Sequence, residues 1–345
     1  MAEKKKKKEL ILNFDPNNPG ISGNIFGLPF DLDTSDVVLI PVPWDVTVSY
    51  KAGTSLGPEA ILAASTQLDY FLPDNPQAWH KGICMLPIRE EWKKQNSELR
   101  PKAHQYIQSL EAGKNLQKHS KDLQKINEAC TSLHQAIKQL SKQLLEQDKT
   151  VGIVGGEHST PLGLLQALAE VNGDFGILQI DAHADLRKAY EGFRYSHASI
   201  MHNALDISAI KQLVQVGIRD ICEAEMQLVK NAPERIAVFF DQHIKEEQFA
   251  SVGWATICEK IVSKLPPHVY ISFDIDGLQP YYCPRTGTPV PGGLSYSEAV
   301  FLIKMIKKSG RKIIGFDLCE VAPGEDEWDA NVGARVLYQL CAHAG

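Results

Sequence analysis

The stretch Asp181-Ala182-His183-Ala184-Asp185 follows the apolar run Phe175 to Ile180 and governs how the rest of the chain is interpreted. Side chains alternate sides in an extended segment, so Asp181, His183 and Asp185 can all point the same way. Two carboxylates and an imidazole on one side of a strand end are suitable ligands for a divalent metal ion. A motif this short also arises by chance as a solvated strand end. Other stretches of the chain decide between these two interpretations.

Two more polar stretches follow apolar runs. Gly155-Gly156-Glu157-His158-Ser159 comes after 151–154, and Asp274-Ile275-Asp276 comes after 269–273. Two buried carboxylates at one strand end need a compensating cation. Four aspartates and two histidines offer mixed oxygen and nitrogen ligation with a charge of about -4, which matches two divalent ions that activate water. The six candidate metal ligands are His158, Asp181, His183, Asp185, Asp274 and Asp276.

Short apolar runs recur along the chain and mostly alternate with helical patterns. The runs lie at residues 37–40, 151–154, 175–180, 213–217, 236–240, 269–273 and 312–318. Apolar residues spaced three and four apart predict a helix over 123–144. This alternation predicts an α/β fold with one mainly parallel sheet covered on both faces. Ligands of such sheets bind beyond the carboxyl ends of the strands, where all six candidates lie.

The amino-terminal third of the chain is harder to interpret. Residues 1–35 are predicted to form an irregular arm, in which the lysine run at 4–8 is a frayed, solvated end. Residues 36–345 are predicted to form a single catalytic domain. Within it, 71–120 has no readable period because several prolines interrupt the pattern.

Composition excludes several classes of protein. The formal net charge of -6 argues against a broad nucleic-acid-binding face. The seven scattered cysteines contain no C-x-x-C pair and indicate reduced thiols in a cytosol. No segment offers the ~18 consecutive apolar residues that a membrane span needs, and the amino terminus does not resemble a secretion signal. A cytoplasmic protein without a nucleic-acid or membrane partner is therefore expected.

The chain resembles the arginase/agmatinase (ureohydrolase) family over residues 36–345. Three ordered motifs carry the resemblance: the stretch 155–159, the stretch 181–185, and Ser272-Phe273-Asp274-Ile275-Asp276-Gly277 running on to Gly287-Thr288-Pro289-Val290-Pro291-Gly292-Gly293. The resemblance implies a three-layer α/β/α, arginase-like fold and a site for two Mn²⁺ ions, with Ni²⁺ or Co²⁺ as open alternatives. It also implies hydrolysis of a guanidinium group with release of urea, and assembly into trimers or hexamers.

The resemblance further implies a role for each site residue. One ion would take His158, Asp181, Asp185 and Asp274, and the other Asp181, His183, Asp274 and Asp276. His197 would carry a proton to the leaving amine, a task that suits an imidazole near its ordinary pKa. Glu320, at the end of the run 312–319, would hold the planar guanidinium by a charge-assisted contact. Asp185 would also accept a proton from the attacking nucleophile.

Substrate choice depends on the residues after Asp185. The segment 186–192 lacks the Thr/Ser/Asn-rich loop with which arginases bind an amino-acid carboxylate, and it is similar to that of agmatinases. A small cationic guanidino substrate is expected, with agmatine, hydrolysed to putrescine and urea in polyamine metabolism, as the best single guess. Three residues depart from the family pattern: Glu157, Gln279 and Arg285. Arg285 is expected to place a cation near the pocket, where it would repel a cationic tail or select an anionic one.

Two alternatives stay open. The first is another guanidino or amidino hydrolase: an arginase, a guanidinobutyrase, a guanidine hydrolase or a formimidoylglutamase. The second is a catalytically silent homologue that acts as a binding subunit. Loss of metal ligands would mark such a homologue, and all six are retained.

Overall fold

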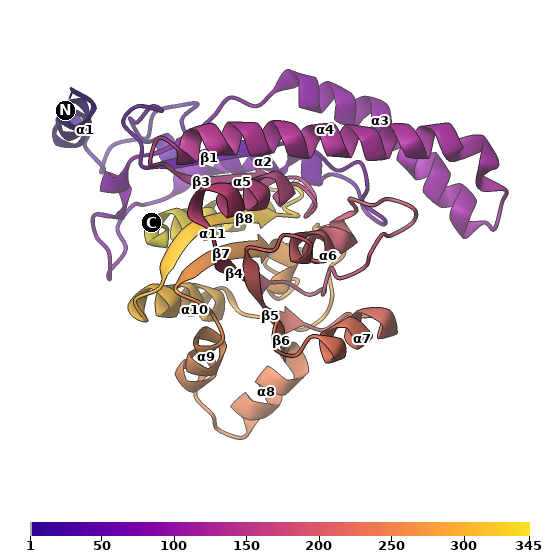
Figure 1. Ribbon diagram of the computed structural model, residues 1–345. Coiled ribbons are helices and arrows are strands. Elements are labelled where there is room, and N and C mark those ends of the chain that lie inside the picture. Colours follow the sequence, from indigo (N-terminus) through magenta and orange to yellow (C-terminus); the bar gives the residue numbers. More distant parts are fainter. Residues whose placement is uncertain (1) are drawn as a thin grey trace.

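Eight parallel strands form one central sheet in the computed structural model, which describes residues 2–345 (Figure 1). Met1 lies outside the described residues. The strand order across the sheet is β2-β1-β3-β8-β7-β4-β5-β6. The strands are β1 (Val37–Val42), β2 (Ile83–Met85), β3 (Thr150–Gly155), β4 (Phe175–Ile180), β5 (Ile210–Ile218), β6 (Ile236–Phe240), β7 (His268–Asp274) and β8 (Lys312–Cys319).

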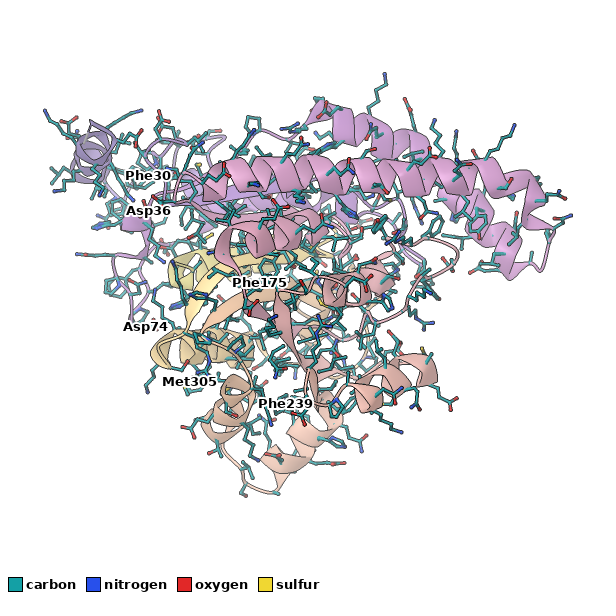
Figure 2. All side chains as sticks on the ribbon, viewed as in Figure 1. Phe30, Asp36, Asp74, Phe175, Phe239 and Met305 are labelled. Carbon is teal, nitrogen blue, oxygen red and sulfur yellow. The ribbon has the colours of Figure 1, made fainter. Side chains whose placement is uncertain are left out.

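Helices cover both faces of the sheet. They are α1 (Ala2–Asn13), α2 (Gly57–Ala64), α3 (Glu90–Glu111), α4 (Ser120–Leu145), α5 (Leu162–Asn172), α6 (Ile200–Leu205), α7 (Glu223–Asn231), α8 (Asp241–Phe249), α9 (Trp254–Ser263), α10 (Tyr296–Lys308) and α11 (Trp328–His343). Strand β1 explains the layering, because Val37 and Leu39 pack into the core beneath α2, α10 and α11 while Val38 and Ile40 pack beneath α3, α4 and α5. Side chains fill both spaces, as Phe175 does on the α4–α5 side (Figure 2). The predicted three-layer α/β/α fold is confirmed.

The predicted strands and helix are all present. Each of the seven apolar runs lies within a strand, and the helix predicted over 123–144 lies within α4. Strand β2 was not predicted, because its three residues are too few to establish a period.

The expectation of a frayed lysine run is wrong. Residues 4–8 lie in α1, whose Leu10 and Ile11 pack against the core. The Lys7 ammonium lies 2.7 Å from the Asp36 carboxylate, and its side chain is only 17% exposed. Apolar contact at one end of the helix and ion pairs along it dock the run against the body.

Helices α3 and α4 form a long antiparallel pair, which we call the helical hairpin (Figure 1). It was only half predicted, because Pro101 lies inside α3 and hides the helical period. On either side of that proline, Leu99 and Ala103 are buried. In Figure 1 the turn between the two helices extends beyond the edge of the layers.

The sheet order determines where chemistry is possible. Strands β3, β8, β7 and β4 are neighbours at the centre of the sheet although they are far apart in sequence. Because all four are parallel, their carboxyl ends meet at one edge. Every predicted metal ligand follows or ends one of three of these strands, and Glu320 follows the fourth.

Two further expectations concern the chain as a whole. Among residues 2–345, no helix combines the length and apolar character needed to cross a bilayer. All seven cysteines are free thiols, and all except the half-buried Cys222 are buried.

Candidate metal centre

The six predicted ligands come together at the edge formed by β3, β4 and β7. The imidazole of His158, which follows β3, is the centre of a first group. Its Nδ1 atom lies 3.0 Å from Asp181 Oδ2, 3.1 Å from Asp185 Oδ2 and 3.3 Å from Asp274 Oδ2. Three carboxylates from two strand ends therefore converge on one nitrogen atom.

A second group overlaps the first. His183 Nδ1 lies 3.1 Å from Asp276 Oδ2 and 3.6 Å from Asp181 Oδ1. Asp181 thus belongs to both groups, as expected of a bridging ligand. Asp274 contacts this group through the Asp276 backbone N–H, which donates to Asp274 Oδ1 at 2.9 Å. A bridging role for Asp274 stays a prediction.

The hydrogen bonds of His158 indicate which of its nitrogen atoms faces the predicted metal site. Its Nε2 lies 2.8 Å from Ser272 Oγ, and that hydroxyl donates to Asp317 Oδ2 at 2.8 Å. Because the hydroxyl proton is committed to Asp317, Nε2–H must donate to Ser272. Nδ1 is buried, has no assigned hydrogen-bond partner and faces three carboxylates. Burial would lower the pKa of His158, but these carboxylates raise it well above its usual range and favour a proton on Nδ1. A divalent cation can take the place of that proton, so the donor set fits a metal.

The pKa values of the carboxyl groups also indicate that this site needs a cation. Burial, with Asp276 and Asp181 adding to it, raises the pKa of Asp274 well above its usual range. Burial and then Asp181 raise the pKa of Asp185 to about 7. Burial would also raise the pKa of Asp181, but His158 and His183 lower it below its usual range. Without added positive charge, the carboxyl groups cannot all be ionised together.

Two of the predicted catalytic residues have strained backbones. Asp185 has φ of 53° and Glu320 has φ of 63°, in the left-handed region that side chains disfavour. The His158 backbone N–H donates to Glu320 Oε1 at 2.9 Å, which fixes the carboxyl group beside the first group. Glu320 Oε2 is buried and has no partner in residues 2–345. Burial, and then Glu157, raise the pKa of Glu320 well above its usual range.

His197 lies across the pocket from the metal ligands. Its Nδ1 is 3.8 Å from Glu320 Oε1, and its Nε2 is 3.1 Å from Ser49 Oγ. Burial, with the charges of His183 and His158 adding to it, lowers its pKa to about 3. The pKa of this residue therefore lies below the ordinary value expected for it, because its burial could not be predicted from local sequence. A neutral imidazole here can accept a proton before it passes one on.

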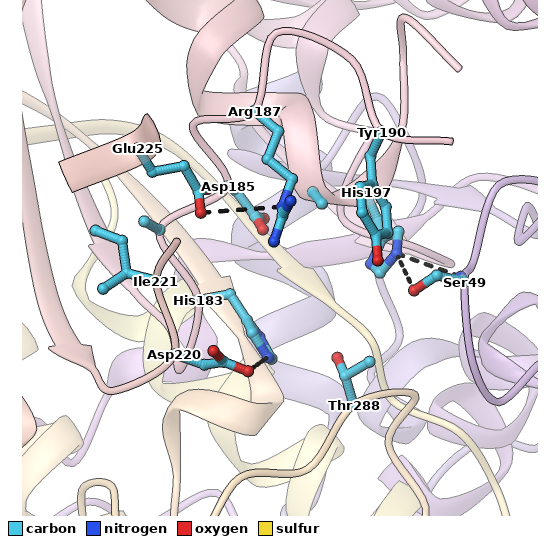
Figure 3. A pocket seen from close by; sticks show the side chains of 12 residues that line it. Ser49, His183, Asp185, Arg187, Tyr190, His197, Asp220, Ile221, Glu225 and Thr288 are labelled. Carbon is cyan, nitrogen blue, oxygen red and sulfur yellow. Dashed lines mark hydrogen bonds and ion pairs between the residues drawn. The ribbon is translucent and has the colours of Figure 1, made fainter. Parts of the chain in front are cut away.

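A pocket of about 140 Å³ opens beside these residues (Figure 3). Arg187 crosses its mouth, where the guanidinium lies 4.6 Å from the Tyr190 ring centre and Nε lies 3.9 Å from Glu225 Oε2. The lining is Ser49, His183, Ala184, Asp185, Arg187, Tyr190, His197, Ala198, Asp220, Ile221, Glu225 and Thr288. Beyond the predicted metal ligands, the lining therefore holds one guanidinium and two carboxylates, Glu225 beside Arg187 and Asp220 4.0 Å from His183 Nε2.

Two departures from the family pattern can now be placed. Arg285 does not line this pocket: its Nη1 lies 3.0 Å from Asp326 and 2.8 Å from Asp329. The expectation that it acts on the substrate is wrong, because these aspartates hold it away. Glu157 is buried and accepts hydrogen bonds from the Thr47 backbone and the Ser159 hydroxyl at 3.0 and 2.9 Å.

Sequence reasoning missed residues that support the ligands. Gln179 Nε2 donates to Asp181 Oδ2 at 2.7 Å, and Gln215 donates to Gln179 Oε1 at 2.6 Å. A signal existed for Gln179, which is a polar residue inside an apolar run, two positions before Asp181 and on the same side of the strand. No signal existed for Ser49, which contacts His197 across a long sequence separation.

Comparison with known proteins agrees with this geometry. A sequence model described as the arginase family matches residues 35–343. An N(1)-aminopropylagmatine ureohydrolase of Thermus thermophilus is 30% identical over 90% of both chains. An agmatinase of Halalkalibacterium halodurans is 28% identical over 88% of this chain and 90% of its own. The crystal structure of agmatine ureohydrolase of Thermoplasma volcanium, 22% identical, matches the fold with a TM-score of 0.71 over 97% of both chains. The predicted family resemblance is confirmed.

Proposed function

This chain belongs to the arginase family, and from that premise we propose that it is a metal-dependent hydrolase that cleaves the guanidinium C–N bond of a small cationic guanidino compound. Agmatine, hydrolysed to putrescine and urea, is the best single candidate. The observation that carries this proposal is the pair of overlapping His/Asp groups that share Asp181 at the edge of a pocket.

Two Mn²⁺ ions are the proposed cofactor. His158, Asp181, Asp185 and Asp274 would hold one ion, and Asp181, His183, Asp274 and Asp276 would hold the other. When bound, such a pair generates a nucleophile from water near neutral pH and polarises the group under attack. Ni²⁺ or Co²⁺ would suit the same mixed oxygen and nitrogen ligands.

Three residues of the chain would act on the substrate. Glu320 has a buried oxygen atom without a partner, and a substrate guanidinium would satisfy it with an N–H donor. His197 lies 3.8 Å from that carboxyl group, and it would pass a proton to the leaving amine. Asp185, a proposed ligand that also lines the pocket, would accept a proton from the attacking nucleophile.

The charges at the mouth of the pocket favour a substrate with a cationic tail. Glu225 lies 3.9 Å from Arg187 and offsets its charge. Asp220 is 68% exposed at the same mouth and adds a second carboxylate. The net negative charge disfavours a substrate carboxylate, as in guanidinobutyrate or formimidoylglutamate. A longer polyamine tail is a second candidate, because relatives that are 28–30% identical are named N(1)-aminopropylagmatine ureohydrolases.

Urea release from the manganese-loaded protein tests the proposal. The panel is agmatine, N(1)-aminopropylagmatine, arginine, guanidinobutyrate and guanidine, with formamide release from formimidoylglutamate measured beside it. Turnover of only agmatine or its aminopropyl derivative supports the inference that the negatively charged mouth selects a cationic tail. Turnover of a carboxylate-bearing substrate keeps the metal chemistry and overturns the charge argument. Two bound metal ions without any turnover would indicate a silent binding subunit.

The family resemblance also suggests the setting of the protein. We expect a cytoplasmic homo-oligomer, a trimer or a hexamer, without a nucleic-acid or membrane partner. Sedimentation at micromolar concentration tests the assembly.

A further inference from the structure

The helical hairpin contacts two of the loops that line the pocket. On α3, Arg100 reaches the segment 45–49, where its Nη1 donates to the backbone carbonyls of Val46 and Val48 at 3.2 and 2.6 Å. A guanidinium that joins two carbonyls two residues apart fixes the path of the chain between and beyond them. Because no strand or helix includes these residues, Arg100 supplies order that regular structure does not.

The segment that Arg100 holds contacts Glu157 and the predicted catalytic residue His197. Thr47 donates to the buried Glu157 carboxyl group through its backbone and its hydroxyl, at 3.0 and 2.9 Å. Ser49 Oγ lies 3.1 Å from His197 Nε2 (Figure 3). A shift in this segment would therefore move the hydrogen-bond partner of His197 without touching a metal ligand.

A second contact holds the neighbouring wall, which carries Tyr190. On α4, Asn127 accepts from the Arg194 backbone N–H at 2.9 Å and donates to the Gly192 carbonyl at 3.3 Å. This loop folds back on itself, since Tyr190 and Phe193 exchange backbone hydrogen bonds of 3.1 and 2.9 Å. Tyr190 lines the pocket beside Arg187. Asn127 thus anchors the loop that sets that wall.

We propose that the helical hairpin is a clamp on the active-site pocket, in which Arg100 positions Ser49 against His197 and Asn127 positions the loop 190–194. Both are positioning residues, since neither lines the pocket within residues 2–345. The clamp is defined by these hydrogen bonds alone, whereas its effect on kcat rests on the proposed function. A hairpin that only adds apolar core would not need donors aimed at these carbonyls.

Hydrogen exchange of the full-length protein tests the clamp without any substrate. Arg100→Met is expected to raise exchange in residues 45–53 at least ~10-fold while β3 and β4 stay protected. Lys94→Met is the matched control, because it removes an exposed cation from the same helix. Unchanged exchange in 45–53 overturns the Arg100 part of the proposal. Asn127→Ala tests the second contact in the same way at residues 187–195, and it keeps the clamp testable if Arg100→Met fails to fold.

A double-mutant cycle tests the link from Arg100 to His197. With two metal ions still bound, Arg100→Met is expected to lower kcat about 10- to 100-fold and to change KM little, as loss of a supporting partner does at a catalytic site. In a His197→Ala background the same change is expected to cost less than ~3-fold, because the group it positions is gone. Equal losses in both backgrounds would reduce Arg100 to a structural residue. If the unaltered protein releases no urea, the proposed function fails while the exchange experiment still tests the clamp.

Discussion

The strand ends of the central sheet and the helical hairpin bury polar groups in opposite ways. At the strand ends, His158 is surrounded by carboxylates: burial would lower its pKa, but Asp181, Asp185 and Asp274 raise it well above the ordinary value. On the hairpin, burial lowers the pKa of His134 to about 4, and neither ring nitrogen has a partner in residues 2–345. The first region gathers charge that needs a cation, whereas the second buries a neutral imidazole at His134.

Removing one predicted ligand should have the largest effect, and it tests whether the strand ends need a cation. Asp276→Asn takes a charged oxygen from the group around His183, so the protein should bind one metal ion instead of two. Activity should fall by at least ~10²-fold, since even partners outside the coordination shell cost ~10–100-fold. Metal analysis and urea release measure both quantities, with the exposed Asp33→Asn as control. Two metals with full turnover would remove Asp276 from the ligand set.

Replacing the proposed proton carrier should separate chemistry from coordination. His197→Ala is expected to lower kcat about 10²- to 10⁴-fold because it removes a proton-transfer group. The metal content should stay at two ions per chain, because His197 is proposed to act on the substrate and is not among the predicted ligands. Metal analysis of the same samples decides this, and loss of metal would move His197 into the coordination shell.

A smaller effect is expected from the residue beneath the ligands. Gln179→Leu keeps the size of the side chain but removes the N–H that donates to Asp181 at 2.7 Å. Metal affinity should weaken about 10- to 100-fold, as for other partners outside the coordination shell. A chelator competition assay measures the change, with the exposed Gln135→Leu as control. Unchanged affinity would mean that His158 and the metal ions alone orient Asp181.

The same contrast explains what the sequence could predict. The strand ends were predictable because polar residues at i and i+2 after an apolar run share one side of a strand, and parallel strands place those ends on one edge. Five of the six predicted ligands came from such local patterns, and His158 came from its place in the glycine turn after β3. The position of Glu320 was predictable for the same reason, since it follows β8 directly.

The hairpin was not predictable because its contacts are long-range and end on backbone atoms. Arg100 meets carbonyl groups 52 and 54 residues away, and any residue could supply a carbonyl. Pro101 also hides the period of α3. The error over Arg285 has a related cause, because its partners Asp326 and Asp329 lie 41 and 44 residues further along the chain.

The smallest expected effect concerns stability, and it tests whether the buried His134 of the hairpin is neutral. This side chain is 3% exposed and packs edge-on against Tyr195, with ring centres 4.9 Å apart. Its folded-state pKa of about 4 lies below the ordinary 6.5, so the unfolded chain binds the extra proton between those values. The free energy of unfolding should therefore fall as pH drops from 6.5 to 4, by on the order of 1–3 kcal/mol from this residue.

His134→Leu isolates that contribution, because other groups that titrate in the same window are common to both proteins. Urea unfolding at pH 6.5 and at pH 4.5 should give a smaller difference in unfolding free energy for the variant than for the unaltered chain. The exposed His104→Leu, on the same hairpin, should leave the difference unchanged. If His134→Leu keeps the full pH dependence, then His134 is charged in the folded protein, and a partner for its proton must lie between the hairpin and the loop that carries Tyr195. His134 would then be a buried charge, as the groups at the strand ends are, and the contrast between the two histidines would fail.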